Sequence, residues 1–108
     1  MAKVVPFKKP SKERDVLSVH DAMKLIRALA QDSKNVFVVR HARRAQEKRK
    51  ITRRQIMTCL QKGRVTEGPS KNIHGNWQVN VSRFAAGEGV TCVVAIELDE
   101  QLIVITVF

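Results

Sequence analysis

The chain has 108 residues, of which 44% are hydrophobic, and a formal net charge of +10. This length fits one domain with a modest core. The charge favours a polyanionic partner such as nucleic acid, an acidic protein or an anionic membrane surface; the simple alternative is a solvated basic face without a partner. No window is long and apolar enough to span a bilayer and the N-terminus lacks a secretory apolar core, so we expect no membrane association and a cytoplasmic location.

The cysteines and histidines do not form a recognisable metal or redox motif. Cys59 and Cys92 lie far apart in segments with an apolar pattern, which is typical of a reduced intracellular protein. The three histidines, His20, His41 and His74, have no ligand-like spacing among themselves. We therefore expect neither a metal ion nor another cofactor.

The N-terminal part predicts a basic arm followed by a helix. Residues 1–15 combine lysines with prolines, which block regular pairing, so a flexible arm is expected there and a single domain over residues 16–108. Ser18 and Asp21 form a pattern like a capping box at the start of a helix. Its apolar stripe, predicted to pack on a sheet, consists of Val19, Ala22, Met23, Ile26, Leu29 and Ala30.

A short apolar run at residues 36–39 is typical of a strand and leads into a strongly basic segment, residues 40–50. This segment has only two apolar residues, Ala42 and Ala45, and is predicted to be a short helix. One side of that helix carries His41, Arg44 and Lys48, with Arg49 near its edge. Since like charges at these spacings repel, the cluster costs stability unless an anion relieves it; a solvated helix face is the alternative.

The next segment predicts a second helix on local signals alone. Thr52 and Gln55 match a capping box, and Ile51 with Ile56 matches a hydrophobic staple. Gly63 is a natural C-terminal stop.

Beyond this glycine the hydrophobic period changes to that of strands. Residues 64–67 predict a short strand broken by Gly68-Pro69-Ser70, and residues 77–82 alternate as in a half-buried strand. Residues 90–98 and 102–108 predict two further strands, joined by a short turn that favours antiparallel pairing. The predicted fold class is α+β, with N-terminal helices packed on an antiparallel sheet of about four strands.

Two motifs resemble a large bacterial domain family. His41-Ala42-Arg43-Arg44, followed by Lys48-Arg49-Lys50-Ile51-Thr52, resembles the family's "His-Ala-Arg … Glu-Arg-Gly-Ile-Thr" opening, with Lys50 in place of its usual glycine. Val104-Ile105-Thr106-Val107-Phe108 is similar to its apolar-Thr-apolar-aromatic ending. Members look like relatives of RelE/ParE and barnase-like toxins, over roughly residues 37–108. The resemblance implies a RelE/ParE-like fold, a toxin that cleaves RNA without a metal, sometimes at the ribosome, and an acidic antitoxin partner.

Metal-free RNA cleavage needs a base for the ribose 2′-hydroxyl, cations around the attacked phosphate and an acid for the departing 5′-oxygen. The predicted catalytic residues are His41, His74 and Thr106, and the predicted phosphate-binding residues are Arg44, Lys48, Arg49 and Arg83. Of these, His41 and Arg49 match the family's opening and Thr106 its ending. His74, as a rival proton carrier, and Arg83 are predicted from their chemistry alone.

Each assignment has a structural alternative. His41 is equally suited to cap the short helix, Arg49 to pair with a carboxylate, and Thr106 to serve as an ordinary β-branched strand residue. Trp77 is suited to stack on a base but fits a core position as well. Three functions stay open: a ribonuclease toxin, a non-catalytic nucleic-acid-binding module, and a ParE-like toxin that inhibits a protein target such as a topoisomerase.

Overall fold

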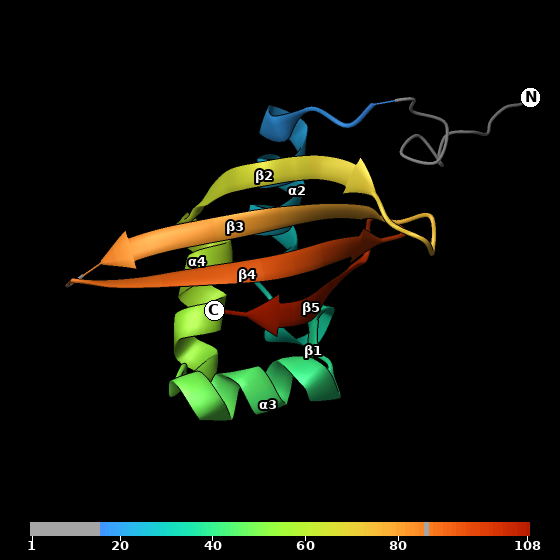
Figure 1. Ribbon diagram of the computed structural model, residues 1–108. Coiled ribbons are helices and arrows are strands. Elements are labelled where there is room, and N and C mark those ends of the chain that lie inside the picture. Colours follow the sequence, from blue (N-terminus) through green and yellow to red (C-terminus); the bar gives the residue numbers. More distant parts are fainter. Residues whose placement is uncertain (1–15, 86) are drawn as a thin grey trace, which may run out of the picture.

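The computed structural model describes residues 16–85 and 87–108 and has an α+β fold (Figure 1). The α-helices of the described residues are α2 (Val19–Leu29), α3 (Arg40–Arg49) and α4 (Arg53–Lys62), and they precede most of the strands. The predicted fold class is thereby confirmed. None of these helices is long and apolar enough to cross a membrane. The predicted basic arm, residues 1–15, lies outside the described residues.

The sheet has five strands in the order β1-β5-β4-β3-β2. They are β1 (Val36–Val38), β2 (Arg64–Lys71), β3 (Trp77–Ala85), β4 (Glu88–Glu97) and β5 (Gln101–Val107), and a short 3₁₀ helix, η2 (Ser33–Asn35), precedes β1. Strands β2 to β5 form the predicted antiparallel meander. The sheet has one strand more than the predicted antiparallel sheet of about four strands, because β1 pairs with β5 in parallel at one edge and makes the sheet mixed.

Helix α2 begins where the sequence predicts. The Ser18 Oγ accepts a hydrogen bond from the Asp21 backbone N–H at 3.0 Å, which satisfies one of the free donors of the first turn. Ala22 and Ile26 are fully buried on the predicted stripe. Val19 departs from it, since its side chain is 50% exposed at the first turn, before the helix reaches the sheet.

Helix α4 carries the complete capping box that the sequence predicts. The Gln55 backbone N–H donates to the Thr52 Oγ1 at 3.1 Å, and the Thr52 backbone N–H donates to the Gln55 Oε1 at 2.7 Å. Ile51 and Ile56 are buried, as the staple requires. The helix ends at Gly63, but this residue has φ −79° and ψ −172° and is not left-handed. The stop is confirmed, and it does not use the left-handed conformation that is common at helix ends.

Several strand boundaries differ from prediction, and for two of them the backbone conformation gives the reason. Gly68-Pro69 does not break β2, because Gly68 has φ +90° and the β2–β3 register shifts around it, so pairing resumes at Ser70. At the other hairpin, β4 ends one residue early. Leu98 and Asp99 both have positive φ and form the turn, so Leu98 is exposed instead of lying in the strand.

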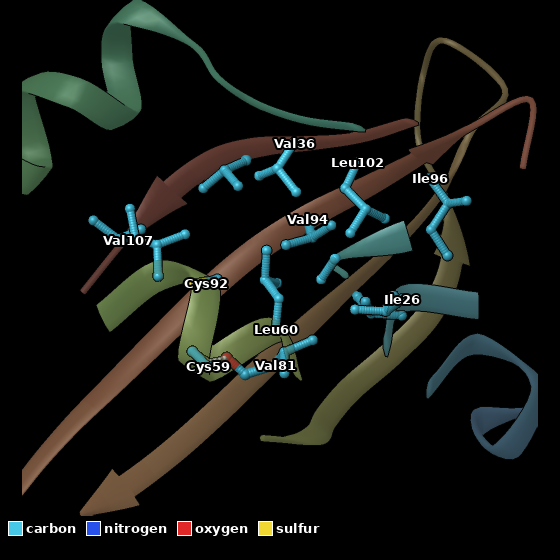
Figure 2. Close-up of a cluster of buried hydrophobic side chains, with 14 of the residues drawn as sticks. Ile26, Val36, Cys59, Leu60, Val81, Cys92, Val94, Ile96, Leu102 and Val107 are labelled. Atoms are coloured by element: carbon cyan, nitrogen blue, oxygen red, sulfur yellow. Dashed lines mark hydrogen bonds between the residues drawn. The ribbon is translucent and has the colours of Figure 1, made fainter. Parts of the chain in front are cut away.

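Helices α2 and α4 cover one face of the sheet, and the core lies between these helices and the sheet (Figure 2). Figure 2 shows Ile26 and Leu60 from these helices facing Val81, Val94 and Leu102 from the strands. Full burial of such a side chain contributes about 1.5–3 kcal/mol, so burial in this layer is a large favourable term in the fold's stability. Both cysteines are buried in the same layer and are free thiols.

Candidate functional site

Helix α3 presents its cations to solvent because its few apolar residues face the sheet. It lies beside β5 and below the β1 edge of the sheet (Figure 1). Ala42 is fully buried in this contact and Ala45 is partly buried, whereas the basic residues are exposed. The helix ends at Lys50, which has φ +58° and ψ +43°. Glycine adopts this left-handed conformation with less strain than lysine does.

A cavity of about 450 Å³ lies between α3 and the end of β5. Its lining consists of His41, Arg44, Ala45, Lys48, Arg49, Thr106, Val107 and Phe108. The lining residues from α3 are spaced so that one side of the helix carries a histidine and three cations, as predicted. The structure therefore brings together all the predicted site residues except His74 and Arg83. We call this space the α3–β5 cavity.

Repulsion among the cations of the α3–β5 cavity destabilises helix α3 only slightly, even when no anion is bound. A like-charged pair at i, i+4, such as Arg44 and Lys48, costs about 0.2–0.5 kcal/mol. Lys48 and Arg49 lie in the last turn of α3, where the helix dipole stabilises a cation by about 0.3–1 kcal/mol. The side chains of Arg44, Lys48 and Arg49 are all exposed. They are thus available to bind an anion.

A bulge turns Thr106 out of the core. Leu102 and Val104 face the helices, and a regular strand would place Thr106 on the same side. The β4–β5 register shifts between Val93 and Val94, which pair with Thr106 and Val104, so β5 has one extra residue there. Val107 then becomes the buried residue and Thr106 lines the cavity. Bulges often re-aim a side chain beside a functional site in this way.

His74 and Arg83 lie elsewhere. His74 is in the β2–β3 turn, where it lines a hollow of about 270 Å³ with Lys71 and Trp77. Arg83 is half-buried on β3 opposite Val90. The hydrogen bond from Cys92 lowers the pKa of the Cys59 thiol, and the nearby charge of Arg83 adds to this. Neither residue lines the α3–β5 cavity, so His41 is its histidine.

The aromatic residue of the cavity is Phe108, which the sequence pattern alone did not assign to the site. Trp77 is buried in the core, and the Lys71 Nζ lies 5.1 Å from the centre of its ring. Trp77 is therefore a core residue and not a stacking surface. Phe108 is 48% exposed and lines the cavity next to Thr106. The available signal in the sequence was an aromatic residue two positions after the predicted site residue Thr106.

A second, larger hollow lies on the face of the sheet opposite α2 and α4. Its volume is about 750 Å³, and its apolar lining includes Val39, Ile73, Leu98, Ile103 and Ile105. The side chain of Ile73 is almost completely exposed. We call this surface the open-face hollow.

The α3–β5 cavity combines a proton carrier, three cations and a hydroxyl group, so it can bind an oxyanion and transfer a proton to or from it. Across residues 16–85 and 87–108, no group of three or more His, Cys, Asp or Glu side chains is placed to hold a metal ion.

The comparisons with known proteins identify a family but not an activity. Neither the search of curated proteins nor the search of solved structures found a match. A family model described as "Domain of unknown function (DUF4258)" matches residues 38–108, which include every residue of the α3–β5 cavity and exclude α2. This match covers more than half of the chain, and the protein therefore belongs to the DUF4258 family.

Proposed function

We propose that this domain is a metal-independent endoribonuclease that acts as the toxin of a bacterial toxin–antitoxin system. The observation that supports it best is the meeting of His41 with Arg44, Lys48, Arg49 and Thr106 in the α3–β5 cavity. Each side chain has a distinct task in phosphodiester cleavage, and they come from two elements far apart in the sequence. A solvated helix face would not need the hydroxyl of a neighbouring strand.

In the proposed reaction, His41 accepts the proton of a ribose 2′-hydroxyl. The 2′-oxygen then bonds to phosphorus while the bond from phosphorus to the 5′-oxygen breaks, which leaves a 2′,3′-cyclic phosphate. The leaving 5′-oxygen takes a proton from water or from protonated His41. Arg44 and Arg49 stabilise the negative charge on the phosphoryl oxygens, and Thr106 donates a hydrogen bond to one of them. Acid–base assistance of this kind contributes about 10²- to 10⁴-fold in rate.

The toxin assignment rests on the resemblance to RelE/ParE and barnase-like toxins together with the net charge of +10. The partners that fit this charge are RNA, either free or at the ribosome, and an acidic antitoxin protein. An acidic antitoxin segment that covers the α3 cations would neutralise the toxin by competing with the RNA phosphate.

The test is cleavage of a labelled RNA in EDTA, with and without ribosomes. We expect the native chain to cut and His41→Ala to cut about 10²- to 10⁴-fold more slowly. His74→Ala is the matched control, because His74 is also an exposed histidine but lies outside the cavity. A folded His41→Ala protein that cuts at the native rate would refute the catalytic role. Salt-sensitive RNA binding without any cutting would identify a non-catalytic nucleic-acid-binding module.

The open-face hollow favours a second candidate, a toxin that inhibits a protein target in the ParE manner. Exposed apolar side chains that gather on one surface, with polar residues around them, are a common feature of protein contacts. Growth inhibition that survives His41→Ala but is lost in Ile73→Asp would support it. Because Ile73 is 95% exposed in a turn, this substitution is expected to leave the fold intact.

A further inference from the structure

Phe108 separates two adjacent hollows. One is the α3–β5 cavity, and the other has a volume of about 340 Å³ and lies between the end of α3, the start of α4 and the start of β4. Both are lined by Phe108 and by Arg49. A large apolar ring, 48% exposed, thus stands beside a cation at the boundary of two spaces.

The backbone of Phe108 is held firmly. Its N–H donates to the Thr91 carbonyl at 2.9 Å, and the Thr91 N–H donates to the Phe108 carbonyl at 2.7 Å. Only the two side-chain torsions stay free, so little conformational entropy is lost when a flat partner covers the ring. An exposed aromatic side chain on a rigid backbone next to cations is the arrangement with which proteins stack the bases of single-stranded nucleic acids.

The second hollow is lined by groups that suit a base better than a phosphate. Gln55 and Glu88 both line it. The Gln55 Oε1 is occupied by the Thr52 N–H, which leaves its amide N–H groups as donors. The Glu88 carboxylate repels phosphate and accepts hydrogen bonds from amino or imino groups on a base edge. Lys50, which also lines this hollow and is exposed, supplies a cation for the sugar–phosphate chain.

A second exposed aromatic side chain, Phe84, lies near the second hollow without lining it. Phe84 is 76% exposed and pairs across the β3–β4 hairpin with Gly89, which lines the second hollow. Its ring lies over this glycine, since a Cβ at Gly89 would be 3.4 Å from the Phe84 Cδ1. The Phe84 ring thus lies beside the backbone of Gly89 but does not line the second hollow, so Phe108 is the aromatic residue of that hollow.

We propose that Phe108 is a base-stacking platform that binds single-stranded RNA across both hollows, with a phosphate in the α3–β5 cavity and the adjoining base in the second hollow. This proposal deepens the proposed function and rests on it. Bases in a duplex are paired and stacked inside the helix and do not reach such a platform. The site therefore selects single-stranded or unpaired RNA of at least two nucleotides.

The test measures the affinity of a fluorescent single-stranded oligoribonucleotide by anisotropy, with the full chain in EDTA and His41→Ala present throughout to prevent cutting. We expect Phe108→Ala to weaken binding about 5- to 150-fold, the usual effect of losing one stacked base. Phe108→Trp should bind as well as the parent. The matched control is Phe37→Ala on β1, since Phe37 is 49% exposed and does not line either hollow.

Two further probes separate stacking from a general loss of structure. An abasic oligonucleotide of the same length should bind Phe108→Ala and the parent equally, because only phosphate contacts are left. Duplex RNA should bind the parent more weakly than the single strand. Equal binding of single-stranded RNA by Phe108→Ala and the parent, while the native chain still cuts RNA, would overturn the stacking platform alone. Absence of both binding and cutting would overturn the proposed function as well.

Discussion

The sharpest structural prediction concerns Gly63, at the end of α4. A Cβ added there would lie 2.5 Å from the Cys59 carbonyl oxygen, 2.7 Å from the Ser82 carbonyl oxygen and 3.0 Å from the Val81 Cγ1. Two of these atoms belong to the backbone and cannot turn away. The Gly63 carbonyl also accepts a hydrogen bond from the Arg27 Nη2 at 3.1 Å, which ties this point to α2. Gly63→Ala must therefore push α4 away from β3 and strain the contact with α2.

Overpacking of a well-packed site costs about 1–3 kcal/mol, and two backbone clashes place Gly63→Ala at or above the upper end. For a domain of this size each kcal/mol lowers the melting temperature by about 4–8 °C, so we expect a decrease of roughly 12–24 °C. Thermal unfolding followed by circular dichroism measures it. Gly63→Asn should be at least as damaging, although asparagine is well tolerated where a helix ends in a left-handed residue.

The matched control is Gly75, which has φ +81° and no atom within 4 Å of the position that a Cβ would take. In Gly75→Ala only backbone strain, of about 1–2 kcal/mol, lowers the stability. Gly75→Asn should lower the stability less than Gly75→Ala does. The asparagine variant should therefore be the more stable of the two at Gly75, whereas at Gly63 it should be no more stable than the alanine variant. A Gly63→Ala protein that melts within about 4 °C of the native protein would refute the close packing of α4 on β3.

Three other substitutions and one labelling experiment have defined outcomes. Thr52→Ala should lower the free energy of unfolding in urea by about 0.5–2 kcal/mol, because it removes the cap of α4. Lys50→Gly should raise it by about 0.5–1 kcal/mol, since the left-handed strain of about 1–2 kcal/mol exceeds the entropy cost of glycine. Cys59 and Cys92 should react with a thiol reagent only as fast as the protein opens, because both are buried and the hydrogen bond with Cys59, together with burial, raises the pKa of Cys92 well above its ordinary value. Arg44→Ala should weaken RNA binding and reduce the slope of log affinity against log salt by about 0.7.

Each of these outcomes can be contradicted. Equal stability of Thr52→Ala and the native chain would remove the capping box as a source of stability, and a less stable Lys50→Gly protein would show that the left-handed turn carries no strain. Rapid thiol labelling of the folded protein at neutral pH would place at least one cysteine at the surface. An unchanged salt slope for Arg44→Ala would show that this arginine does not contact phosphate.

The local features of this protein could be read from its sequence. The capping box of Thr52 and Gln55, the cap at Ser18 and the alternation from Trp77 onward depend on residues a few positions apart, and the structure confirms them. Helical geometry likewise predicts that His41 and the cations of α3 lie on one side of that helix. Interactions over one or two turns have the same pattern in any fold, which is why such signals are reliable.

The remaining features were decided by contacts between distant parts of the chain. The parallel pairing of β1 with β5, the bulge that turns Thr106 toward α3, and the place of Phe108 between two hollows all depend on the register of strands that are far apart in sequence. His74 and Arg83 were plausible from chemistry, but the meander carries them away from α3. The sequence by itself determined which elements form and which residues share a helix side; only the tertiary structure decided which sides meet, because register is set by packing of the whole core.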